Sequence, residues 1–369
     1  MNKVLKIFGL ILSVIILAAA SAALYEFFKN DQESVDRERP AMMTDGPKNI
    51  PAEKLPAGCV SNPSPAFTHA FTDLAKIEAL GILGGVVGGS PGRSYATIKK
   101  GEKVPVYNPT DAVLETIVWA DRGSGQSEYG FYFRASCEVT YLLDHVEEIA
   151  DGIKNLRPKE PAKSTATQFG SQPNVSIKAG ELLGYTDGTP QARTFDFLLY
   201  NKAKPAFHVN PARWDWEQTV YADCPYDYYG EDLKKQHYAL LGSPAGEGKI
   251  LKAKNCGSPS QDVAGTLSGG WFQGDSTTEK GKWVVFGQQF SQVEMAIREN
   301  GANKTFALKE FSPKITPDKI TPGQGACFQG YENNWAYAKL ISDTKLSLAT
   351  GAGQCPAAFP EAQAEIWER

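Results

Sequence analysis

The chain has 369 residues, of which 42% are apolar and 22% are charged, a composition that is ordinary for globular protein. Its length allows two domains with cores of their own. Its formal net charge is −4, so it lacks the excess of Lys and Arg on which nucleic-acid binding depends. The composition therefore predicts a folded protein and argues against nucleic acid as a partner.

Residues 1–28 are predicted to be a membrane anchor or a signal peptide. Lys3 and Lys6 precede an uncharged run, Ile7 to Tyr25, which is close to the length of a membrane-spanning helix. The alternative is cleavage, because Ala20-Ser21-Ala22 has the small-x-small form of a signal-peptidase site. Both interpretations export the rest of the chain, either tethered to the outer face of the cytoplasmic membrane or secreted. The charged, Pro-bearing residues 29–58 predict a flexible linker.

The six cysteines are expected to be paired, because an exported chain meets an oxidising compartment. Sequence proximity suggests three bridges, Cys59 with Cys137, Cys224 with Cys256, and Cys327 with Cys355. No two cysteines have the CxxC spacing, which argues against a metal site made of thiolates.

Residues 59–210 are predicted to form an all-β domain. The stretch 66–92 is expected to be helical or mixed, and it ends in a Gly-rich turn. The segments KVPVYNPTDAVLETIVWA (103–120) and EYGFYFRASCEVTYLLDHV (128–146) each combine alternation or β-branched and aromatic residues with a turn, which indicates pairs of strands. VSIKAGELLGYTDG (175–188) is typical of a hairpin framed by glycines, and FDFLLYN (195–201) indicates a further strand.

The remaining chain divides into a connecting segment and a second domain. Residues 211–258 are rich in aromatic residues and contain one helical stretch, Glu231–Leu241. Residues 259–369 are expected to form a smaller antiparallel β domain, a sandwich or a small barrel, because short alternating segments recur at a spacing of about ten residues. These segments are GTLSGGWFQG, GKWVVFGQQF, VEMAIREN, TFALKEF, ENNWAYAKLI and KLSLATG. The predicted fold class is therefore mainly β.

The first β domain resembles the lysostaphin-type zinc endopeptidases of the bacterial cell wall. The phrases that carry the resemblance are KVPVYNPTDAVLETI, TYLLDHVEEI, VSIKAGELLGYTDG and TFDFLLYN, which follow the order of the family's strand pair, its YxHL segment, its Gly-framed hairpin and its HxH segment. The resemblance implies a β-sandwich with a duplicated hybrid motif for residues 59–210. It says nothing about the C-terminal domain.

The resemblance also assigns candidate site residues. Enzymes of the family hold zinc with an HxxxD pair and the second His of HxH, which leaves one position of the metal open for water. His145 falls on a catalytic histidine of the family. Thr194 and Asp196 stand where HxH has its histidines, and of these two only Asp196 has a side chain that ligates zinc. His69 and Asp73 have the HxxxD spacing, although they lie further from the next strand than in the family.

Two functions therefore remain open. The first is a non-catalytic envelope protein without a cofactor, which binds or scaffolds a cell-wall glycan or peptide, or an envelope protein, as inactive relatives of hydrolases do. The second is a zinc-dependent cell-wall endopeptidase with a rearranged ligand set of His69, Asp73 and Asp196, with His145 as a catalytic residue. The first is favoured, because the second requires two departures from the family's ligands at once.

The aromatic residues of the connecting segment suggest a ligand-binding surface. Trp216, Tyr226, Tyr228 and Tyr229 lie close together in the sequence, and aromatic rings stack on sugar rings as well as they fill protein cores. A glycan-binding module would place the tyrosines along an exposed groove, whereas a structural role would bury them.

Overall fold

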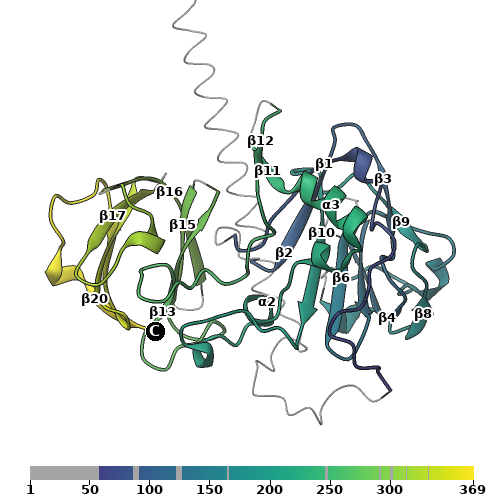
Figure 1. The fold of residues 1–369 in the computed structure, drawn as a ribbon, viewed down its shortest axis with the longest axis horizontal. Helices are drawn as coiled ribbons and strands as arrows, with labels where there is room; N and C mark the ends of the chain where they lie inside the picture. The colour runs from purple at the N-terminus through teal and green to yellow at the C-terminus, as the bar shows by residue number, and fades with distance from the viewer. Residues whose placement is uncertain are drawn as a thin grey trace, which may run out of the picture.

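The computed structural model describes residues 58–369, apart from 86–90, 122–126, 164–165, 246–247, 291, 300–301, 313 and 331. The predicted anchor, residues 1–28, and the linker up to residue 57 lie outside these residues. The chain is mainly β and forms two β units that lie next to each other (Figure 1). Within the described part of the chain, no helix has the length and apolar character that crossing a membrane requires.

The first β unit contains two antiparallel sheets. The larger sheet has seven strands in the order β1-β2-β10-β6-β5-β4-β8. These strands are β1 (Ile77–Leu80), β2 (Arg93–Ile98), β4 (Ala112–Asp121), β5 (Ser127–Arg134), β6 (Val139–Val146), β8 (Val175–Ile177) and β10 (Thr194–Asn201). The smaller sheet is formed by β3 (Val104–Tyr107), β9 (Leu182–Thr186) and β7 (Glu148–Ile149).

The strands predicted between residues 103 and 201 are confirmed, but the hairpin predicted at 175–188 is wrong, because β8 pairs with β4 and β9 pairs with β3 and β7. The stretch 66–92 is mixed, because the short 3-10 helix η3 (Leu74–Lys76) leads directly into β1. Two further 3-10 turns, η4 (Lys154–Leu156) and η5 (Thr167–Phe169), lie in the polar loop before β8.

Side chains of both sheets meet in one core. On β10, Phe195, Phe197 and Leu199 are fully buried against residues of the smaller sheet such as Val106 and Leu183. Burial of each such side chain stabilises the fold by about 2 kcal/mol. Since side chains alternate along a strand, the residues between them, including Asp196, point to the opposite face of the larger sheet.

Part of the connecting segment also packs on this core. The 3-10 helix η7 (Pro225–Tyr228), the helix α3 (Glu231–Leu240) and the hairpin of β11 (Gly242–Pro244) and β12 (Ile250–Lys252) follow one another there. The predicted helix at 231–241 is thus confirmed. Before them, η6 (Pro211–Arg213) and α2 (Glu217–Val220) run along the second unit, where Trp214 packs against Phe272.

The second β unit is a closed barrel of eight antiparallel strands in sequence order. They are β13 (Gly269–Phe272), β14 (Trp283–Gln289), β15 (Gln292–Glu299), β16 (Ala302–Ser312), β17 (Gly325–Gly330), β18 (Asn334–Ser342), β19 (Lys345–Ala352) and β20 (Glu365–Glu368), with 3-10 turns η8 (Pro317–Lys319) and η9 (Glu361–Gln363). Phe272 pairs with Glu368 and closes the barrel. Trp271, Trp367, Phe286 and Phe328 are buried in its core. Of the predicted alternatives, the barrel is the observed one, and β17 and β20 were not anticipated.

Three disulfides join the cysteines as proximity suggested. They are Cys59–Cys137, Cys224–Cys256 and Cys327–Cys355. The chain has no free cysteine. Because disulfides persist in oxidising compartments, this pattern is typical of an extracytoplasmic protein.

Candidate functional site

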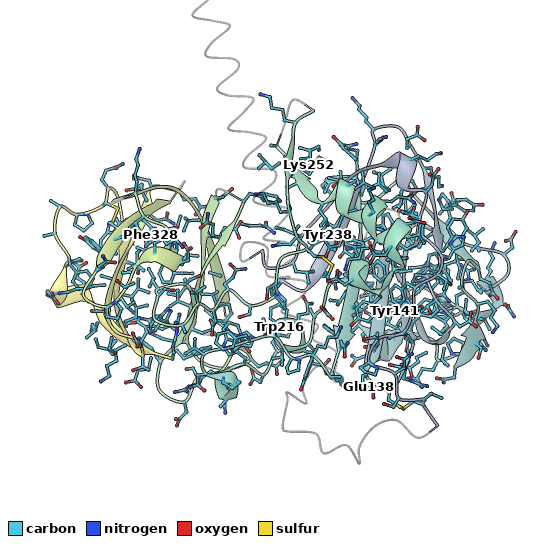
Figure 2. The ribbon with its side chains drawn as sticks, viewed as in Figure 1. Glu138, Tyr141, Trp216, Tyr238, Lys252 and Phe328 are labelled. Atoms are coloured by element: carbon cyan, nitrogen blue, oxygen red, sulfur yellow. A yellow bond between two sulfur atoms is a disulfide. The ribbon has the colours of Figure 1, made fainter. Side chains whose placement is uncertain are left out.

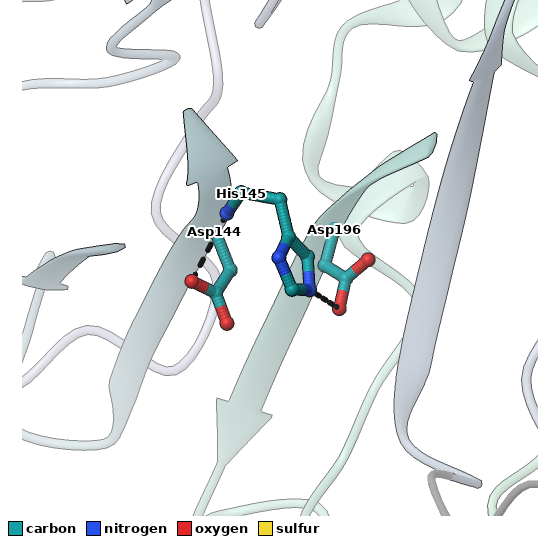
Figure 3. A group of neighbouring side chains, drawn as sticks. All are labelled: Asp144, His145 and Asp196. Atoms are coloured by element: carbon teal, nitrogen blue, oxygen red, sulfur yellow. Dashed lines mark hydrogen bonds and ion pairs between the residues drawn. The ribbon is translucent and has the colours of Figure 1, made fainter. Parts of the chain in front are cut away.

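A cluster of ionisable side chains lies on the outer face of the larger sheet, where β6 and β10 run next to each other (Figure 3). Asp196 on β10 pairs in register with Asp144 on β6. One ligand atom from each of Asp144, His145 and Asp196 lies within 4.8 Å of the other two. The structure thus brings together His145 and Asp196, which the sequence had proposed, and adds Asp144.

A β-bulge allows two adjacent residues to reach this cluster. Tyr129 pairs with Val146 and Phe131 pairs with Leu143, so that Asp144 and His145 together face Gly130 alone. His145 has a φ of 61°, which turns its side chain away from the regular alternation of the strand. A Cβ atom on Gly130 would lie 3.0 Å from Asp144 Oδ1, so the glycine leaves room for that carboxylate.

The guanidinium of Arg93 bridges the two aspartates. Arg93 lies on β2, the neighbour of β10 on its other side, and pairs in register with Leu198. Its Nη1 atom donates to Asp196 Oδ2 at 2.5 Å and to Asp144 Oδ2 at 3.0 Å. The Asp196 side chain is 1% exposed and the Asp144 side chain 8%. Burial alone would lower the pKa of Arg93, but the charges of Asp196 and Asp144 raise it, so the guanidinium stays charged.

His145 is held in its protonated form. Its Nδ1 lies 2.9 Å from Glu128 Oε2 and its Nε2 lies 3.5 Å from Asp196 Oδ2, so both ring nitrogens face carboxylates. Burial lowers the pKa of His145, but the charges of Asp144 and Asp196 and the hydrogen bonds to Asp196 and Glu128 raise it well above its usual value. An imidazolium has no lone pair, so His145 in this state neither binds a metal nor accepts a proton.

In this structure the lone pairs that a zinc ion would need are already engaged. A zinc ligand must offer a lone pair, so a zinc ion would have to displace the proton from His145. The two aspartate oxygens that face the centre of the cluster are already bonded to Arg93, which supplies the positive charge that a metal would otherwise supply. Two positive side chains, Arg93 and His145, face three carboxylates, those of Asp144, Asp196 and Glu128, so that most but not all of the negative charge is compensated.

The remaining candidate ligands lie outside this cluster. The ring of His69 is exposed, packs edge-on against Tyr107 at 5.0 Å between centroids, and donates from Nδ1 to the carbonyl oxygen of Ala70. Asp73 caps the N-terminus of η3, where its carboxylate accepts from Ala75 N. Thr194 pairs with Thr97 of β2. The rearranged zinc set of His69, Asp73 and Asp196 is therefore not assembled in this structure.

The proposed glycan-binding role of the tyrosine cluster is wrong. Tyr226 is 0% exposed, Tyr228 7% and Tyr229 5%, and all three belong to the core of the first unit. A buried ring has no face to offer to a sugar. Trp216 is half-buried and precedes α2, apart from that core. The tyrosines pack in the core as apolar side chains, and the sequence alone did not distinguish this role from stacking on a ligand.

Sequence analysis missed Arg93, Asp144 and Glu128. The segment RSYATI does alternate like a strand, which is a signal that could have placed Arg93 on the same face as Tyr95. No local pattern reveals that this strand pairs with β10. Asp144 was passed over because neighbouring residues of a regular strand point to opposite faces, and the bulge removes that restriction.

Comparison with known proteins yields no assignment, since the chain matches no protein-family model and no curated protein.

Proposed function

We propose that the chain is an exported, membrane-tethered envelope protein whose first β unit is a degenerate relative of the lysostaphin-type peptidases and no longer hydrolyses peptide bonds. Its role is to bind or scaffold a cell-wall component or a partner protein. The seven-stranded and three-stranded sheets of this unit are compatible with the sandwich that the resemblance implies.

The observation that carries the proposal is the position of Arg93. Hydrolysis by this family requires a zinc ion with an open coordination position. Here a guanidinium is bonded to Asp144 and Asp196, and His145 is protonated between Glu128 and Asp196. These paired charges hold strands together, and neither a bonded guanidinium nor an imidazolium activates a water molecule.

The test is zinc content and hydrolysis, measured on the full chain purified in mild detergent. We expect the protein to retain far less than about one zinc per chain after dialysis and to release no soluble fragments from purified peptidoglycan. About one zinc per chain that is lost in Asp196→Ala, together with peptidoglycan cleavage, would overturn the proposal in favour of the zinc endopeptidase.

Two arginine variants sharpen this test. Arg93→Ala removes the resident positive charge, so we expect this variant to bind added Zn²⁺ more tightly than the wild type does. Arg134→Ala is the matched control, because Arg134 bonds Glu115 at 2.5 Å elsewhere on the same sheet. If Arg93→Ala and Arg134→Ala bind Zn²⁺ equally, Arg93 does not block the cluster.

The binding role has its own measurement, which is retention of the chain on insoluble peptidoglycan and chemical cross-linking to envelope proteins in cells. Retention or a specific cross-linked partner supports the proposal. Absence of both leaves no binding partner and refutes it.

A further inference from the structure

The β11–β12 hairpin stands out from the first unit between the two β units (Figure 1). Its base is fixed. Leu80 of β1 forms a bridge with Leu241, Ala253 N donates to Leu241 O at 3.1 Å, and the Cys224–Cys256 disulfide follows the second strand closely. Because the base is held in this way, the direction in which the hairpin projects is fixed by the fold.

The hairpin is basic in an acidic chain. Residues 242–255 contain Lys249, Lys252 and Lys254 and a single acidic residue, Glu247, whereas the whole chain has a net charge of −4. All three lysines are exposed. Lys252 Nζ donates to Ala239 O at 2.8 Å, at the end of α3 (Figure 2).

Helix α3 adds no net positive charge beside the hairpin. Lys235 lies one helical turn before Ala239, which Lys252 reaches, but the exposed Glu231 lies one further turn before it on the same face. The positive charge of this surface therefore comes from the three lysines of the hairpin.

The same hairpin exposes apolar surface. Leu251 is 43% exposed, and Ile250 beside it is half-buried. Apolar side chains flanked by lysines on a projecting element match the boundary between lipid headgroups and acyl chains, where the apolar groups enter and the ammonium groups stay at the phosphates. A soluble polyanion would pair with the lysines but would offer no apolar surface to Leu251.

We propose that this hairpin docks on an anionic lipid surface and thereby fixes the orientation of the body on the membrane that carries it. The predicted linker, residues 29–58, reaches up to roughly 100 Å when extended, so the anchor alone leaves every face of the body free to approach the membrane. Each lysine near an anionic surface raises the binding constant roughly fivefold. The hairpin alone would therefore bind weakly, whereas tethering the chain to the membrane raises the effective concentration of the hairpin there and makes its binding effective. The inference rests on the membrane tether of the proposed function, and its test does not involve the cluster at Arg93.

The test uses the full chain inserted in vesicles, so that the anchor is common to all samples. Exposed amines are modified with a membrane-impermeant acylating reagent, and the rate at each lysine is read by peptide mass spectrometry. We expect Lys249, Lys252 and Lys254 to react at least about fivefold more slowly in phosphatidylglycerol vesicles than in phosphatidylcholine vesicles. The difference should vanish in 0.5 M salt, where the Debye length is only about 4 Å. Lys154, Lys159 and Lys163, exposed on the polar loop of the first unit, are the reference residues.

Variants distinguish an effect of the hairpin lysines from a general effect of positive charge on the protein. Lys252→Gln with Lys254→Gln should remove most of the protection at Lys249, and Leu251→Ser should weaken it. Lys154→Gln with Lys159→Gln is the matched control and should leave it intact. Equal rates at Lys249, Lys252 and Lys254 in the two kinds of vesicle would refute docking. Protection by a soluble glycerol-phosphate polymer and not by vesicles would also refute it, and would identify an anionic wall polymer as the ligand.

Discussion

His237 should make the first β unit sensitive to mild acid. Its side chain is 0% exposed and stacks between the rings of Phe71, Tyr226 and Tyr229. Burial lowers the pKa of His237 to about 4, although the hydrogen bond from the ring to the carbonyl of Leu233 opposes the shift. In the unfolded chain a histidine has a pKa of about 6.5.

The direction in which the free energy of unfolding changes with pH follows from proton binding. Between these two pKa values the unfolded chain binds a proton at His237 and the folded chain does not, so the free energy of unfolding falls as the pH falls. The stabilisation is complete above about pH 6.5 and is lost progressively down to about pH 4. The full loss is about 3 kcal/mol, of which about 2 kcal/mol has occurred at pH 5.

His237→Phe removes the titrating group and keeps an aromatic ring in the stack. At pH 8 we expect the free energies of unfolding of the variant and the wild type to differ by less than about 1.5 kcal/mol. At pH 5 the difference should shift by about 2 kcal/mol in favour of the variant. The assay is urea unfolding at both pH values, followed by amide NMR signals of the first unit. The comparison at pH 8 isolates the packing change, so the difference between the two pH values reports protonation.

The pKa of His237 can be measured directly, because the chain has only four histidines and their imidazole signals can be followed by NMR. His237 should not titrate above about pH 5. A titration midpoint of His237 near pH 6.5 would refute the prediction. So would a difference in the free energy of unfolding between variant and wild type that is the same at pH 5 and at pH 8.

Three further predictions concern stability. Arg93→Ala leaves Asp144 and Asp196 buried without their cation and should cost about 3–5 kcal/mol in urea unfolding, and a loss below about 1 kcal/mol would mean that the pair is solvated. Gly184→Ala would place a Cβ atom 2.0 Å from Glu148 O and should cost about 1–3 kcal/mol by separating β7 from β9, seen as faster amide exchange in β7. Cys327→Ser with Cys355→Ser opens a loop with a sequence separation of 28 and should lower the free energy of unfolding of the barrel by about 3–4 kcal/mol, seen as a lower urea midpoint for the barrel alone.

Local features of the fold could be predicted from the sequence. Alternation and turn residues marked most strands, and 175–188 does contain two strands, β8 and β9, on either side of a turn at Gly180. The predicted hairpin is wrong, because β8 pairs with β4 in the larger sheet and β9 pairs with β3 and β7 in the smaller one. The cysteine pairs followed from the order of the cysteines, because each bridge joins one cysteine to the next along the chain, at sequence separations of 78, 32 and 28. Neither signal requires knowledge of which strands pair.

The site could be predicted only in part, because it depends on pairings between distant strands. The register of β10 between β2 and β6 places Asp196 beside Arg93 and Asp144, and no property of RSYATI or TFDFLLYN alone fixes that order. The predicted ligand-binding role of the tyrosines failed for another reason. Stacking on a sugar and packing in a core call for the same side chains, and only the covering elements η7 and α3 decide between them.

The charge network explains how the larger sheet keeps two carboxylates at buried positions. Asp196 is 1% exposed, and an uncompensated carboxylate there would be protonated or would unfold the sheet. Arg93 and His145 reach it from β2 and from the bulge of β6, so compensation requires both strands to be in register with β10. A one-residue slip of either strand would turn its charged side chain to the apolar core. The network therefore fixes the register of three central strands, which is a structural reason for retaining these side chains even where no reaction takes place.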